Sequence, residues 1–411
     1  MMELEIQHTK GQIDGWIAIL AIGFAAYAQL VNSYENTMIL YVIICGIIIL
    51  NVVRTPRGKN HLIKILTSKG IWLMMILVLF ACVWNTPESL QSCIYQLLSC
   101  ILAITAGYMM TAGSEKDDID KFWFKLAIFL AIGAIYGVVE YFTHVNYFFT
   151  IIYTGTFDGT GTTGRITSWY LHPIPFAHAM IYGFAIALYK IKNTILKYSL
   201  LIIFSFVIIA SGSRSAWIVW ALLILMWVYQ YIKRYVRKRT FIVGIVGFVF
   251  LLVLLSTDIA TSLFEFVDKR LGSAGASISN EMRSNVYDYF FHTLFNRGIF
   301  PILFGNGFGQ STTALDSALF ESMAVDNTFL QIMYDYGVIA FLLLAVLIIK
   351  WIIQFIQSRK STDDKTVIAI LLSNVLMSCF YDSIGWKSVS VISFMIIGMW
   401  MYRNEERRWN N

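Results

Sequence analysis

The sequence has little charge and few cysteines. Charged residues make up 14% of the 411 residues, whereas hydrophobic residues make up 58%, and the mean hydropathy is +0.66. The five cysteines lie in or beside apolar stretches and form no CxxC pair, so the sequence predicts neither a disulfide framework nor a cysteine-ligated metal site. This composition is typical of a polytopic membrane protein.

Apolar runs recur along the whole chain, and many approach the roughly 17 to 25 residues that cross a bilayer as a helix. They predict an all-α protein with about twelve transmembrane helices. The expected spans are residues 14–31, 37–53, 71–84, 88–112, 122–140, 173–189, 198–211, 215–232, 240–257, 327–349, 366–383 and 389–402. The first run lacks a small-residue cleavage site, so we expect a retained helix and not a signal peptide.

Basic residues gather in alternate loops, including 54–69, 233–239 and 350–365. Because Lys and Arg favour the cytoplasmic side, this pattern predicts that both termini are cytoplasmic, in a bacterial inner membrane. The net charge of +6 then reflects orientation, and nucleic-acid binding is not expected.

The expected spans divide the chain into five parts: N-terminal helices over 1–140, an extracytoplasmic loop over 141–172, helices over 173–257, a large extracytoplasmic loop over 258–326, and the last helices with a cytoplasmic tail over 327–411. Loops as long as these two are usually functional or disordered. Both long loops fall on the same side in this topology, so the polar residues concentrate on one face of the membrane. These loops contain no cluster of residues typical of a metal site. We expect no metal and no cofactor.

The segment Ser211–Ser215 separates two apolar runs and contains Arg214. A charge at the centre of a membrane helix costs about 2.5 to 3.5 kcal/mol on insertion scales, so a partner or a function is expected. The structural alternative is an arginine that reaches the interface with its long side chain. Ser213 belongs to the same motif.

In the first loop, Arg165, Trp169 and Tyr170 place a cation beside two flat amphipathic rings. Such groups can hold phosphate and stack on sugars, although an aromatic belt at the membrane surface explains the rings equally well. His172 precedes Pro173. We expect it either to be a secondary candidate for the proton-accepting base or to have only a structural role.

The second loop predicts a helix that starts near 279–281 and runs to about Phe295. Its apolar positions are expected at Met282, Val286, Tyr289, Phe290 and Phe295. Arg283 and Tyr287 then lie one turn apart on a common face.

A glycine-rich run follows at 303–309. No strand precedes it and it lies on the outer face, so a tight turn or a close backbone approach is expected and not a nucleotide site.

At the end of this loop, Asp326 and Asn327 stand immediately before a long apolar run. We expect Asp326 to be a helix cap, a carboxylate base at the outer membrane interface, or both.

Together these stretches resemble the O-antigen polymerase and O-antigen ligase superfamily of membrane glycosyltransferases. The matching pieces are Arg165–Ala177, Ser211–Ser215, Arg283, Leu303–Gly309 and Asp326–Val338. The resemblance implies a GT-C-like helical bundle and metal-independent transfer from an undecaprenyl-diphosphate-linked oligosaccharide. Ligases usually carry His-Asn where this chain has Asp326-Asn327, and that difference favours a polymerase of O-antigen or capsule repeat units.

In this interpretation Asp326, Arg214 and Arg283 are the catalytic residues: Arg214 and Arg283 hold the departing diphosphate and Asp326 accepts the proton. The substrate-binding candidates are Arg165, Trp169, Tyr170, His172, Ser213, Tyr287 and Asn327. Expected partners are the lipid-linked glycan, membrane lipid, a chain-length regulator and a flippase. A ligase that uses lipid A core or another acceptor stays open. A transporter is disfavoured because the helix interiors carry so few charges, with Glu140 and Asp382 as the residues to check.

Overall fold

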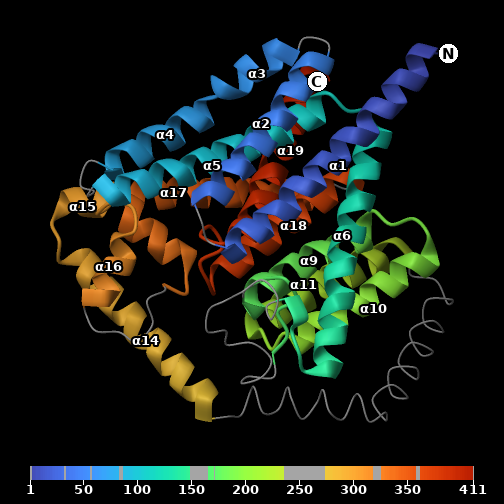
Figure 1. Ribbon diagram of the computed structural model, residues 1–411. Helices are drawn as coiled ribbons and strands as arrows, with labels where there is room; N and C mark the ends of the chain where they lie inside the picture. Colours follow the sequence, from blue (N-terminus) through green and yellow to red (C-terminus); the bar gives the residue numbers. More distant parts are fainter. Residues whose placement is uncertain are drawn as a thin grey trace.

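The protein is described here by a computed structural model that covers residues 2–31, 34–55, 58–82, 87–148, 165–170, 172–235, 274–317, 325–357 and 362–410. Over these residues the chain forms helices and no strand (Figure 1). In chain order the helices are α1 (Met2–Val31), α2 (Tyr34–Arg54), α3 (Gly58–Leu66), α4 (Lys69–Cys82), α5 (Pro87–Ala112), α6 (Lys116–Thr143), α9 (Pro173–Tyr189), α10 (Thr194–Ala210), α11 (Arg214–Tyr235), α14 (Ala274–Phe295), α15 (Ile299–Phe304), α16 (Gln310–Ser317), α17 (Thr328–Gln357), α18 (Thr362–Ser378) and α19 (Lys387–Asn410).

Four described stretches are long and apolar enough to cross a membrane, namely Asn36–Arg54, Leu90–Ala112, Lys116–Thr143 and Thr328–Gln354. The pair α3 and α4, bent by 41°, adds a fifth if it is counted as one span. The other apolar helices are shorter, with 10–17 residues. The chain is therefore a helical membrane protein, as predicted, but by this criterion the described part has fewer spans than the expected twelve.

Residues 54–69 were expected as a loop, yet they contain the amphipathic helix α3, which buries Ile65 while Lys59 is exposed. A short helix forms there because apolar and basic residues alternate at helical spacing. The expected span at 240–257 lies outside the described residues.

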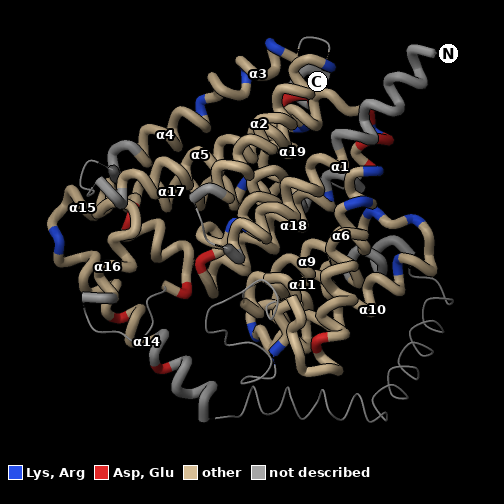
Figure 2. The backbone as a smooth tube through the Cα atoms, in the orientation of Figure 1, with Lys and Arg blue, Asp and Glu red and all other residues tan. Residues whose placement is uncertain are grey.

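Charged residues sit mainly toward the ends of the helices (Figure 2). Basic residues lie along α3 and also flank the connection between α9 and α10. At that connection, Lys190 Nζ lies 2.7 Å from Asp120 Oδ1. This arrangement leaves the middle of the bundle apolar, as a bilayer requires.

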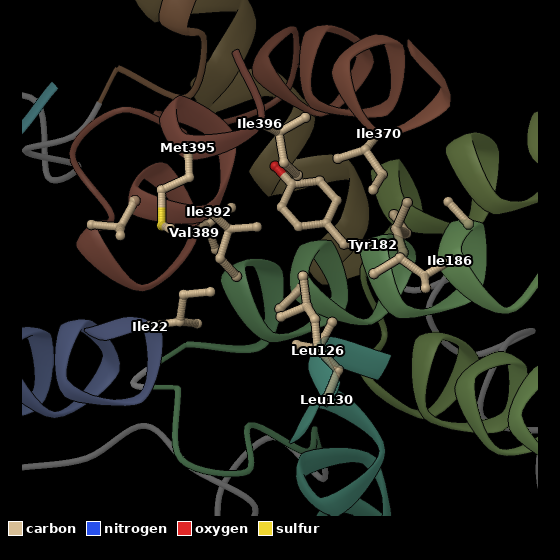
Figure 3. Close-up of a cluster of buried hydrophobic side chains, with 14 of the residues drawn as sticks. Ile22, Leu126, Leu130, Tyr182, Ile186, Ile370, Val389, Ile392, Met395 and Ile396 are labelled. Carbon is tan, nitrogen blue, oxygen red and sulfur yellow. The ribbon is translucent and has the colours of Figure 1, made fainter. Parts of the chain in front are cut away.

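Helix α9 forms the centre of the bundle. Each of its residues from Pro175 to Leu188 is buried, which is typical of a helix enclosed on all sides. The hydroxyl of Tyr182 donates to Asn374 Oδ1 at 3.0 Å and lies 2.7 Å from Ser393 Oγ, so α9 is tied to α18 and α19. Figure 3 shows the surrounding side chains, contributed by α1, α6, α9, α18 and α19.

Helices α5 and α19 pack with their backbones in contact. A Cβ atom on Gly107 would lie 1.9 Å from the carbonyl oxygen of Met395, and one on Gly398 would lie 1.9 Å from that of Ile104. Small residues permit this approach, which is common between membrane helices. The last helix of the chain is thereby fixed to the N-terminal half.

A second, smaller core joins α14, α16 and the first turns of α17. Val286, Phe290 and Leu294 of α14 are buried there, together with Leu315 and Tyr334. The predicted helix is thus present, although it starts at Ala274, about five residues before the expected start. Its buried stripe uses Leu294, and the expected Phe295 is 61% exposed, since spacing by four selects residue 294.

Candidate active site at one end of the bundle

The turn between α10 and α11 is built by serine hydroxyls. Ser211 Oγ donates to the carbonyl of Ile208 at 2.7 Å and accepts the N–H of Ser213 at 3.2 Å, while Gly212 takes a positive φ of 63°. The Ser213 and Ser215 hydroxyls lie 3.0 Å apart. Arg214 is the first residue of α11 and is half-buried. Two apolar helices therefore meet at a tight turn that presents an arginine.

Arg165 contacts the same turn. Its Nε donates to the carbonyl oxygen of Ser211 at 2.9 Å, although 46 residues separate the two in sequence. Two of the predicted cationic residues, Arg165 and Arg214, thus belong to one corner of the bundle. Guanidinium groups gathered in this way suit a diphosphate, which they bind through paired hydrogen bonds.

Glu140, near the end of α6, holds the loop that carries Arg165. It is fully buried, and it accepts the N–H of Thr167 at 3.1 Å and that of Ser168 at 2.7 Å. Ser168 in turn donates through Oγ to the carbonyl of Gly133 at 2.9 Å. Backbone donors stabilise a buried carboxylate, so Glu140 has a structural role here and gives no support to a transport pathway.

The two predicted sugar-stacking rings pack into the bundle. Tyr170 is 2% exposed and packs against Phe176 in a tilted arrangement, with ring centroids 5.8 Å apart. Trp169 packs so closely on Gly133 that a Cβ there would lie 2.8 Å from its ring. The buried ring of Tyr170 does not fit the expected sugar contact; the loop uses both rings as apolar anchors, because burying large aromatic surfaces is strongly favourable.

His172 caps α9. Its Nδ1 accepts the N–H of Ile174 at 3.3 Å, and Pro173 occupies the first turn of the helix. Its ring lies 5.8 Å from that of Trp386, centroid to centroid. These contacts favour a structural role for His172. The ring contact joins the start of α9 to the segment between α18 and α19.

Asn327, and not Asp326, caps α17. Asn327 Oδ1 accepts the N–H groups of Phe329 at 2.9 Å and Leu330 at 3.1 Å, as an N-cap residue does. Asp326 is half-buried, and the Tyr287 hydroxyl of α14 donates to its carbonyl oxygen at 3.3 Å. The prediction that Asp326 caps α17 is therefore wrong, because Asn327 makes the cap hydrogen bonds.

A second carboxylate, Asp382, lies near Asp326. The two segments are joined by Thr328, whose Oγ1 donates to the carbonyl of Tyr381 at 2.8 Å and accepts the N–H of Ser383 at 3.0 Å. Burial raises the pKa of the Asp382 carboxyl, and the negative charge of Asp326 raises it as well. Burial and a like charge both disfavour the ionised form of a carboxyl, and such an environment is typical of carboxyl groups used in acid–base catalysis.

The glycine-rich run makes the close approach that was predicted. Cβ atoms on Gly305 and Gly337 would each lie 2.2 Å from a carbonyl oxygen of the facing segment, those of Asp335 and Leu303. The buried carboxylate of Asp335 accepts the N–H of Gly309 at 3.1 Å and that of Ser311 at 2.8 Å. Asp335 therefore fixes the start of α16 against α17, and no sequence spacing indicated that contact.

The remaining candidate, Arg283, lies in α14 one helical turn before Tyr287. Its side chain falls outside the described part of the chain. Within that part, no group of three or more His, Cys, Asp or Glu residues could hold a metal ion.

The fold brings these pieces to one end of the bundle, which we call the site end. It comprises the loop 165–172, the turn 211–214, the start of α17 at 326–328 and the segment 381–387. Sequence reasoning missed Asp382 as a partner of Asp326. Its position beside the last apolar run was visible, but its proximity to Asp326 depends on how α17 packs on α18.

Comparison with known families adds independent support. Residues 199–345 match the model of the O-antigen ligase family, Wzy_C. No curated protein matches the chain. The matched region contains helix α14, the glycine-rich run and two of the four segments of the site end, namely the turn 211–214 and the start of α17. The predicted resemblance to the O-antigen polymerase and ligase superfamily is thereby confirmed over residues 199–345, which match the O-antigen ligase family.

Proposed function

We propose that this protein polymerises undecaprenyl-diphosphate-linked oligosaccharide repeat units of a surface polysaccharide on the outer face of the inner membrane. A hydroxyl oxygen of the acceptor sugar attacks the anomeric carbon of the donor glycan. The bond from that carbon to the diphosphate oxygen breaks, and undecaprenyl diphosphate leaves. The growing chain is thus transferred onto the sugar end of another lipid-linked unit.

Arg214 stabilises the departing diphosphate, assisted by Arg165 and Arg283. The observation that carries this assignment is the 2.9 Å hydrogen bond from Arg165 Nε to Ser211, which places Arg165 at the turn where Arg214 begins α11. Donors placed in advance where charge develops lower the barrier to transfer and need no metal. Ser213 and Ser215 keep the turn in this shape.

Asp326 accepts the proton of the attacking hydroxyl. Asn327, and not Asp326, caps α17, so this role of Asp326 does not compete with the cap. Asp382 lies close enough for the two charges to interact, and the charge of Asp326 together with burial raises the pKa of Asp382. Tyr287 holds the Asp326 backbone from α14 and so links the large loop to the base.

In this proposal both termini are cytoplasmic, and residues 141–172 and 258–326 form the extracytoplasmic loops. The helices on either side bind the lipid chain, while the glycan meets the loops. A flippase must deliver the lipid-linked unit to this face, and a chain-length regulator is the expected partner that ends polymerisation.

The decisive experiment uses a deletion strain that carries the wild-type gene, Arg214→Ala or Asp326→Asn, with the surface glycan resolved by size. Wild-type protein should restore the full ladder, whereas both variants should leave a single repeat unit at normal protein abundance. Asp326→Asn should still bind the donor, because it changes the base and not the arginines. A full-length polymer made by Arg214→Ala would sink the proposal.

The second candidate is a ligase that transfers finished glycan to lipid A core or another acceptor, and the matched family model favours it by its description. The same deletion strain separates the two. A polymerase defect leaves short, single-repeat glycan, whereas a ligase defect leaves long lipid-linked chains that are not attached.

A further inference from the structure

A cavity of about 380 Å³ lies beside the site end, among α2, α5 and α19. This volume falls within the roughly 300 to 1,000 Å³ typical of small-molecule sites. One side is closed by Phe308 of the glycine-rich run, and another by Ile384 and Gly385, which precede α19. The family resemblance assigned no role to the helices that form most of its wall.

The chemistry of the wall suits a saccharide. Hydroxyl and amide groups come from three helices and include Thr37, Ser92, Gln96, Ser99 and Ser390. Between them stand aromatic rings. Sugars combine many hydroxyl groups with apolar ring faces, so they require polar partners alternating with flat aromatic surfaces.

The charge of the wall argues against a diphosphate. Among the described lining residues, Lys387 is the one cation, and its Nζ donates to Thr37 Oγ1 at 2.8 Å. A diphosphate binds best to several guanidinium groups, which the corner with Arg165 and Arg214 supplies. The cavity and the arginine corner therefore differ in the ligand chemistry that they favour.

The cavity shares a wall with the carboxylate pair. Asp382 Oδ1 accepts the N–H groups of Ile384 at 3.1 Å and Gly385 at 3.0 Å, and both of these residues line the cavity. Asp382, the partner of the proposed base, thus belongs to a tight turn that also forms part of the cavity wall. A glycan in the cavity therefore lies next to the turn held by the carboxylate that interacts with Asp326.

We propose that this cavity binds the acceptor glycan, and that it holds the sugars next to the one that carries the attacking hydroxyl. The inference rests on the proposed transfer reaction and adds to it a separate acceptor subsite on the N-terminal half of the chain. The donor diphosphate is held at the arginine corner, and the two ligands approach the carboxylates from different helices.

The test measures binding of a lipid-free repeat-unit oligosaccharide, prepared from the strain's own polysaccharide, to purified full-length protein in nanodiscs. Ser99→Phe fills the cavity, and Gln96→Leu removes polarity at nearly constant volume. Each should weaken binding by about tenfold or more, the loss expected when a buried polar contact is removed. Ile94→Phe adds a ring at an exposed position of the same helix and should bind like wild type.

Arg214→Ala should also bind the oligosaccharide normally, because it changes the donor corner only. Undiminished binding by Ser99→Phe and Gln96→Leu would overturn the acceptor subsite even if polymerisation depends on Arg214. Conversely, a normal polymer ladder made by the Arg214→Ala protein would contradict the proposed reaction, whatever the binding measurements give. The two failures are therefore distinguishable.

Discussion

Asp326 and Asn327 are adjacent residues with different tasks. Asn327 supplies the two cap hydrogen bonds of α17, whereas Asp326 lies beside Asp382. Asn327→Ala should lower the free energy of unfolding by about 1 kcal/mol, the usual cost of a lost cap, and Asn327→Ser should restore it. Asp326→Asn should leave thermal stability in detergent nearly unchanged while polymer is lost. Equal destabilisation by Asp326→Asn and Asn327→Ala would contradict this division.

Asp382 should make stability depend on pH. Burial and the charge of Asp326 raise its pKa above the usual 3.8 in the folded protein, so the folded state holds the proton to higher pH than the unfolded state. The favourable contribution of the neutral carboxyl is complete below pH 3.8 and is lost as pH rises through the raised pKa. Thermal unfolding between pH 4 and 8 should therefore show wild type losing stability relative to Asp382→Asn.

The matched control for this comparison is Glu406→Gln, at an exposed position near the end of α19. It should follow the wild-type profile. A wild-type profile parallel to that of Asp382→Asn would mean that the carboxyl ionises alike in the folded and unfolded states.

At the scale of elements, the contact between α5 and α19 depends most strictly on glycine residues that have no side chain. Gly398→Ala places a Cβ atom 1.9 Å from the carbonyl of Ile104, so the helices must separate, at a cost of about 1 to 3 kcal/mol or more. Gly46→Ala, in α2, meets no atom within 4 Å and should be neutral or slightly stabilising. The midpoint of thermal unfolding in detergent measures both, and a stable Gly398→Ala protein would show that the helices tolerate separation.

Several elements were predictable from the sequence because their signals are local. The apolar runs marked the helices, helical spacing located α14, and glycine content indicated the turn at 303–309. The fate of Trp169 and Tyr170 was not predictable, because the same rings suit a sugar platform, an interface belt or a core. Packing decided it: Trp169 lies against the small residue Gly133 of α6, and Tyr170 is buried beside Phe176.

At the scale of the whole molecule, the orientation in the membrane can be measured directly. His144 follows α6 and is exposed near the site end, whereas Thr67 is exposed between α3 and α4. In a background without the native cysteines, His144→Cys should react in intact cells with a maleimide that cannot cross the membrane. Thr67→Cys should react only after the cells are opened. The reverse pattern would place the site end in the cytoplasm and remove the proposed reaction.

The site end also shows the limit of sequence reasoning about the whole molecule. Its parts come from residues 165–172, 211–214, 326–328 and 381–387, and nothing in their sequence spacing states that they meet. The resemblance to a known superfamily predicted that the first three segments belong to one site. Asp382 joined them only through packing, since Thr328 binds both Tyr381 and Ser383.

The contact between α19 and α5 has a consequence for how the protein is made. Translation delivers α5 to the membrane long before Met395, the residue that faces its glycine surface at Gly107. Until Met395 is made, α5 lacks this neighbour, and the part of the cavity wall that α19 supplies is missing. Synthesis must therefore pass α19 before α5 can complete its packing, and a product that ends earlier exposes a surface that favours misassembly.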